Sequence, residues 1–108
     1  MSDLPHATDT SPDWLFAEID RSFGSMEDFR RVLREQCADV RRGKSVHLIC
    51  TPQGSLRLLH EAPHGRAHGN VLMTFAAAHD AQEPTVDLRL LALRYLRYLQ
   101  TRPPYPLP

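Results

Sequence analysis

The histidines are the residues of this chain whose type and spacing come closest to a chemical site. His60, His64 and His68 follow one another at intervals of four residues, which on a helix would align three imidazoles as metal ligands. A proline and glycines lie among them, however, and these residues are incompatible with a helix. A loop could still gather the three side chains around zinc, with His79 as a fourth ligand. Solvated loop histidines are the simpler interpretation, so we expect no bound metal and no cofactor.

A second pattern, residues 38–45 (ADVRRGKS), matches a permissive form of the nucleotide-binding P-loop with Ala38 in place of the first glycine. That chemistry needs a strand, then a glycine-rich loop around the phosphates, then a helix whose N-terminus faces them. Here the order is reversed, because a helical pattern ends at Gly43 and a strand pattern follows. We therefore reject nucleotide binding at this segment.

The chain also lacks the sequence signatures of common enzymes. It contains no nucleophile elbow, no H-E-x-x-H and no glycine-rich dinucleotide turn. A triad could assemble from Ser45, a histidine and an acid, but almost any chain with these residues would pass that test. We expect a protein that is not an enzyme.

Arginines on the second predicted helix, residues 25–43, give a possible nucleic-acid surface. Arg30, Arg34 and Arg41 would lie along one flank of that helix, with Lys44 nearby. Arg34 and Arg41 have no acidic residue three or four positions away, which would leave them free to bind an external anion. The first turn of the helix is acidic, however, and would be repelled by phosphate if it entered a DNA groove. The alternative function is therefore sequence-indifferent binding of nucleic acid through this flank.

A protein interface is the function that we favour from the sequence. Thirteen basic residues balance thirteen acidic ones, so little repulsion opposes self-association. Two leucines fall on the polar side of the last predicted helix, and the single tryptophan lies on the flank of the first. We predict a non-catalytic protein-binding module, a small regulator, inhibitor or adaptor that acts as a homodimer. The candidate contacts are Trp14, Arg34, Arg41, Leu90, Leu93 and Arg97.

The elements that must position these residues follow from hydrophobic periodicity and turn residues. Apolar residues at helical spacing predict helices over 11–24, 25–43 and 85–100. Alternating residues predict strands over 46–51 and 56–61, joined by a proline-glycine turn. Residues 71–79 favour a third strand, although they also contain strong helix formers.

The predicted fold is accordingly α+β in the order ααβββα, with a three-stranded antiparallel sheet packed by helices. The inward face of the sheet would carry the apolar residues Val46, Leu48, Leu56, Leu58, Val71, Met73 and Phe75. Ile49, Leu59 and Leu72 would point to the opposite face.

Composition and the chain ends bound the remaining organisation. We expect a disordered segment over 1–10, a single domain over 11–102, and a proline-rich extended tail over 103–108. Cys37 and Cys50 have no metal-binding spacing and are expected to be reduced and buried. The sequence contains no secretory signal and no apolar run of about 20 residues, so we expect a cytoplasmic protein with no membrane contact.

Overall fold

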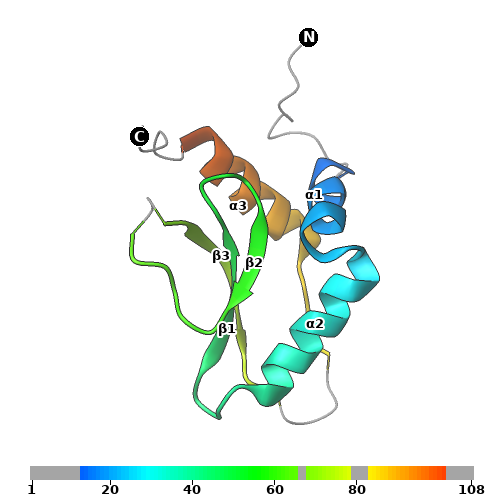
Figure 1. The fold of residues 1–108 in the computed structure, drawn as a ribbon, viewed down its shortest axis with the longest axis vertical. Coiled ribbons are helices and arrows are strands. Elements are labelled where there is room, and N and C mark those ends of the chain that lie inside the picture. The colour runs from blue at the N-terminus through cyan, green and yellow to red at the C-terminus, as the bar shows by residue number, and fades with distance from the viewer. Residues whose placement is uncertain (1–12, 66–67, 79–82, 102–108) are drawn as a thin grey trace.

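The computed structural model describes residues 13–65, 68–78 and 83–101. Three helices and three strands follow one another in the predicted order ααβββα, which confirms the α+β class (Figure 1). The predicted disordered segment, the proline-rich tail and His79 lie outside the described residues. The elements are α1 (Asp13–Phe23), α2 (Met26–Asp39), β1 (Ser45–Cys50), β2 (Leu56–Leu59), β3 (Asn70–Ala76) and α3 (Leu88–Thr101).

The corner between α1 and α2 is built by two adjacent residues. Gly24 has a φ of 102°, a left-handed conformation that favours glycine, and its N–H donates to Asp20 O at 2.8 Å. Ser25 then caps α2, because its hydroxyl oxygen accepts a hydrogen bond from the N–H of Asp28 at 2.9 Å. The sequence predicted both the corner and the cap.

The C-terminus of α2 lies earlier than the sequence predicted. The helix ends at Asp39, and Val40 is already extended, with φ −71° and ψ 145°. The apolar pattern continues to Val40 because that side chain is buried against the core, at 5% exposure. Arg41 therefore lies beyond the helix, in the turn that leads to β1 and in which Lys44 N–H donates to Arg41 O.

β1 is the central strand of an antiparallel sheet with the order β2-β1-β3. In the predicted hairpin, Leu48 lies opposite Leu58 and Cys50 lies opposite Leu56. Residues that alternate along β1 and β2 therefore share the inward face, as the sequence predicted.

β3 contains one extra residue relative to β1. Leu48 lies opposite Met73 and Ile49 lies opposite Val71, so Leu72 has no counterpart in β1. This β-bulge changes which residues face the core. Leu72 is fully buried within the core cluster, whereas Val71 is only partly buried. The prediction that Val71 faces inward and Leu72 outward was wrong, because alternation in the sequence does not reveal an inserted residue.

The ends of β3 and α3 also differ from their predicted bounds. The third strand predicted over 71–79 is confirmed as β3, but it ends at Ala76, after which Ala78 N–H donates to Cys37 O at the end of α2. α3 begins at Leu88, because the carboxylate of Asp87 accepts the N–H of Leu90 at 3.1 Å and caps the helix.

All three helices contribute to one core on one side of the sheet. Figure 1 shows α1 and α2 on that side and the segment between β2 and β3 on the other. That segment approaches the outer face closely: a Cβ on Gly69 would lie 3.0 Å from Cys50 O and 3.4 Å from the side chain of Ile49. The buried cluster consists of Leu15, Ile19, Phe29, Leu33, Cys37, Val40, Val46, Leu48, Cys50, Leu56, Leu72, Phe75, Leu91, Tyr95 and Tyr98.

The bulge predicts that truncating the side chains of two neighbouring residues will destabilise the fold by unequal amounts. Leu72→Ala should lower the free energy of unfolding by about 2–5 kcal/mol, because it leaves a cavity in the core. Val71→Ala should lower it by roughly 1 kcal/mol, because the side chain is partly exposed. Urea unfolding followed by circular dichroism measures both values. A larger loss of unfolding free energy for Val71→Ala than for Leu72→Ala would contradict the register between β1 and β3.

Candidate functional site

The outer surface of α3 is an apolar patch bordered by arginines. Leu90 is 36% exposed and Leu93 is 52% exposed, and within the described ranges these two are the large apolar side chains that stand exposed. They recur with Arg94 and Arg97 at positions i, i+3, i+4 and i+7, so the four side chains share one side of the helix. We call these four residues the α3 face.

The α3 face surrounds a hollow of about 500 Å³. Leu96, Gln100 and Thr101 complete its lining. Leu96 is only 3% exposed, so it contributes a buried apolar wall. Three of the six predicted interface residues therefore meet on one surface. They are Leu90, Leu93 and Arg97.

The charge of α3 has one sign. The helix carries three arginines and no acidic residue. Arg94 Nη1 donates to Leu72 O on β3 at 2.7 Å, which ties the helix to the bulge. Arg89 and Arg97 form no ion pair within the part of the chain that the structure describes. The α3 face thus has an apolar centre and an unneutralised positive border.

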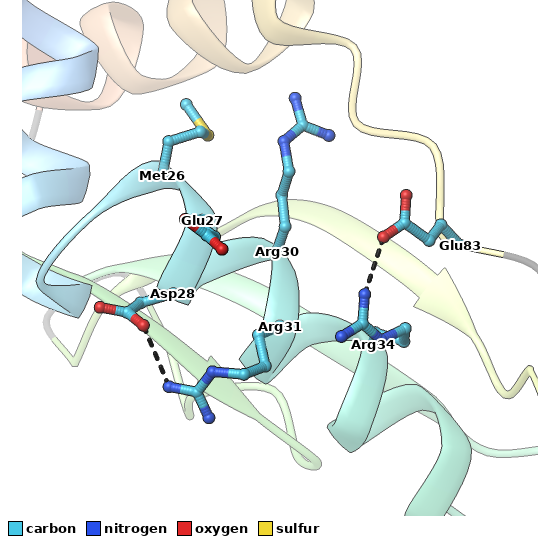
Figure 2. Close-up of a pocket in the computed structure, with 7 residues that line it drawn as sticks. All are labelled: Met26, Glu27, Asp28, Arg30, Arg31, Arg34 and Glu83. Atoms are coloured by element: carbon cyan, nitrogen blue, oxygen red, sulfur yellow. Dashed lines mark hydrogen bonds and ion pairs between the residues drawn. The ribbon is translucent and has the colours of Figure 1, made fainter.

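The arginines of α2 line a second hollow, of about 580 Å³. Figure 2 shows Arg34 directed at Glu83, with 2.8 Å between Nη1 and the carboxylate oxygen. Glu83 lies in the segment that precedes α3, so this pair links α2 to a distant part of the chain. The prediction that Arg34 is unpaired was therefore wrong, because only neighbours along the helix were considered. The hollow is lined by Met26, Glu27, Asp28, Arg30, Arg31, Arg34 and Glu83.

Carboxylates also neutralise Arg31, another arginine of α2. Arg31 pairs with Asp28 at 3.1 Å and with Glu35 at 3.6 Å. The hydrogen bond from Arg31, together with the one from Ser25, lowers the pKa of Asp28, and the bond to Asp28 raises the pKa of Arg31. Both groups are therefore held in their charged forms. Arg30, by contrast, has no ion pair among the described residues.

Arg41 and Lys44 contribute to a third hollow, of about 430 Å³, beyond the end of α2. Because α2 ends at Asp39, Arg41 does not continue the flank of Arg30 and Arg34. Two acidic residues, Asp39 and Glu61, line the same hollow. The four proposed nucleic-acid residues are therefore divided between two hollows of mixed charge, and they do not form a continuous basic strip.

The histidines do not converge in the part of the chain that the structure describes. His60 forms a hydrogen bond through Nε2 with Gln36 Oε1 of α2, which holds its ring against that helix. No group of three or more histidine, cysteine, aspartate or glutamate side chains within the described ranges could hold a metal ion. His64 and His68 lie exposed in the segment between β2 and β3.

Trp14 is partly buried and packs against another helix. Its ring stacks on Tyr95 of α3, with ring centroids 5.7 Å apart and planes inclined by 20°. Its Nε1 is buried and makes no hydrogen bond in the described structure. Trp14 therefore joins α1 to α3, away from the α3 face.

Sequence reasoning missed several residues that line the α3 hollow. The hollow is also lined by residues that were not among the candidate contacts, namely Arg94, Leu96, Gln100 and Thr101. The absence of acidic residues from α3 was a signal that could have identified this surface.

The two cysteines, Cys37 and Cys50, are both buried thiols. Burial raises the pKa of the Cys37 thiol, which disfavours the reactive thiolate. This environment fits small apolar core residues better than nucleophiles.

Cysteine accessibility should therefore depend on unfolding. We expect Cys37 and Cys50 to react slowly with a thiol reagent such as Ellman's reagent in buffer and rapidly in denaturant. The rate of absorbance change measures this difference. Rapid reaction of either thiol under native conditions would contradict the burial.

Within the described ranges no helix combines the length and apolar character needed to cross a membrane. Comparison of the chain with known protein families, curated proteins and solved structures gives no match.

Proposed function

We propose that this chain is a non-catalytic protein-binding module that acts as a homodimer and binds its partner through the α3 face. The observation that carries the proposal is the convergence of Leu90 and Leu93 on one hollow. Exposed leucines one turn apart remain in water unless another surface covers them, and covering each would contribute about 1–2 kcal/mol. Apolar patches with a polar border are typical of protein interfaces.

The charge of α3 indicates the chemistry of the partner. Arg89 and Arg97 are not neutralised by carboxylates in the described structure, and both are exposed. A second α3 would bring further arginines against them, so the helix is poorly suited to pair with itself. The partner we propose is an amphipathic helix of another protein that presents leucine-like side chains flanked by carboxylates.

Nucleic acid fits the arranged residues less well. Arg34 and Arg31 are paired with carboxylates, so binding phosphate there would first require those pairs to break. The hollow that contains Arg41 and Lys44 also contains acidic residues. No feature of the described residues favours this second candidate over the α3 face.

A designed peptide tests the proposed binding directly. The probe is a labelled amphipathic helix with leucine on one side and glutamate on the other, and the control peptide has lysine in place of glutamate. Fluorescence anisotropy should show saturable binding of the glutamate peptide and much weaker binding of the lysine peptide. The double variant Leu90→Glu/Leu93→Glu should weaken binding by about 100-fold or more.

Two further variants separate apolar contact from charge. Arg97→Glu should weaken binding of the glutamate peptide by about 10-fold and strengthen binding of the lysine peptide. Ala38→Glu adds the same charge at an exposed position of α2 and should leave both affinities unchanged. The proposed site is wrong if the folded wild-type chain does not bind the glutamate peptide, or if Ala38→Glu weakens binding as much as the leucine substitutions do.

A further inference from the structure

The two edges of the sheet are protected very differently. At the β2 edge, the backbone N–H of Leu56 points away from β1 and donates to Ser22 Oγ of α1 at 3.0 Å. The Ser22 hydroxyl in turn donates to Glu18 Oε2 at 2.8 Å. At Leu56, α1 thus satisfies one backbone group that another strand would otherwise bind.

The register defines which backbone groups point outward from β3. Ala77 N–H donates to Lys44 O, and these residues are opposite each other one step beyond the Ser45–Ala76 pair. In an antiparallel ladder such bonded pairs alternate with unbonded ones. The N–H and C=O groups of Phe75 therefore point toward β1, and those of its neighbours Thr74 and Ala76 point away from it.

These outward groups of β3 have no partner in the described structure. Arg94 reaches the edge only at Leu72, where it binds the carbonyl oxygen. Beyond the bulge, the backbone N–H and C=O groups of Thr74 and Ala76 form no hydrogen bond with any described segment. We call residues 73–76 the open edge.

The sequence of the open edge lacks the features that keep strands apart. Residues 73–76 (MTFA) contain no charged residue and no proline, the two devices that most often block edge pairing. The side chains of Thr74 and Ala76 are exposed on the outer face of the sheet. A neutral strand could therefore pair along it.

We propose that the open edge pairs antiparallel with the open edge of a second copy of this chain. The two-fold axis would pass through Phe75, so that Thr74 of each copy lies opposite Ala76 of the other. This register pairs the outward N–H and C=O groups of both residues and leaves Leu72 O to Arg94. The product is a continuous six-stranded sheet in the order β2-β1-β3-β3-β1-β2.

A second copy is the occupant that completes the sheet. An antiparallel strand is complementary to itself about a two-fold axis, so no other sequence is needed. The two edges that remain are both β2 edges, where Ser22 already accepts the N–H of Leu56. The zero net charge of the chain adds no repulsion between them.

Sedimentation of the full chain tests the pairing. The proposal depends on the homodimer in the proposed function but not on the α3 face, so the two can fail separately. The wild type should sediment with a mass twice the 12.3 kDa of one chain.

Ala76→Pro removes an outward N–H without breaking a bond to β1, and it should weaken dimerisation by about 100-fold or more. Ala76→Thr keeps that N–H and should remain dimeric.

A disulfide cross-link tests the register. Bonded antiparallel partners have Cα atoms about 5.5 Å apart, which lies within the range for a disulfide. A mixture of Thr74→Cys and Ala76→Cys chains should therefore form a mixed disulfide dimer under mild oxidation. Each variant alone should cross-link far more slowly, because identical positions lie further apart.

The outcomes separate the edge from the other surfaces. A wild type that remains monomeric at about 1 mM would overturn the proposal, and so would an Ala76→Pro dimer that is as stable as the wild type. If Ala76→Pro fails to fold, Ala76→Lys gives the same test, because this exposed position tolerates a charge that opposes edge pairing. The monomeric variant should still bind the glutamate peptide. Loss of the dimer in Leu90→Glu/Leu93→Glu but not in the edge variants would overturn the assignment to β3.

Discussion

The pairing of β1 with β3 across the bulge at Leu72 is the constraint on which the rest of this structure depends. The extra residue turns Leu72 into the core, and it leaves the carbonyl of the same residue outside the ladder. Arg94 binds that carbonyl, so the bulge also gives α3 a polar contact with β3. One inserted residue thus supplies both a core side chain and a hydrogen-bond acceptor for the last helix.

The two surfaces that we consider functional both arise from incomplete cover around this bulge. α3 buries one side through Leu91, Tyr95 and Tyr98, which leaves the opposite side in solvent. The same helix reaches the edge of β3 only at Leu72. Beyond Leu72, the outward backbone groups of Thr74 and Ala76 have no partner among the described residues.

Much of the fold could be predicted because its signals are local. The α1–α2 corner depends on Gly24 and the cap on Ser25, and both lie within a few residues of the bonds they make. The end of α2 was misplaced because the burial of Val40 extends the apolar pattern past the last helical residue. The bulge was missed because Val71, Leu72 and Met73 are all apolar, so alternation has no contrast there.

The candidate sites were only partly predictable, for a related reason. Leu90 and Leu93 conflict with an amphipathic pattern, and the structure leaves both exposed. Arg34, in contrast, looked unpaired because its carboxylate partner, Glu83, is distant in sequence. The open edge of β3 could not be inferred at all, because whether a strand lies at an edge depends on strand order. A sequence reveals residues that violate a local pattern, but it does not reveal the distant residues that contact them in the fold.

The stack of Trp14 on Tyr95 gives the protein an internal optical reporter. Trp14 is the single tryptophan of the chain, and its ring lies between the first and last helices with a buried indole nitrogen. The emission of the folded protein therefore arises from one fluorophore in one apolar environment. Separation of α1 from α3 would bring water to the indole and shift its emission to longer wavelength. The contact between α1 and α3 can thus be observed without any added label.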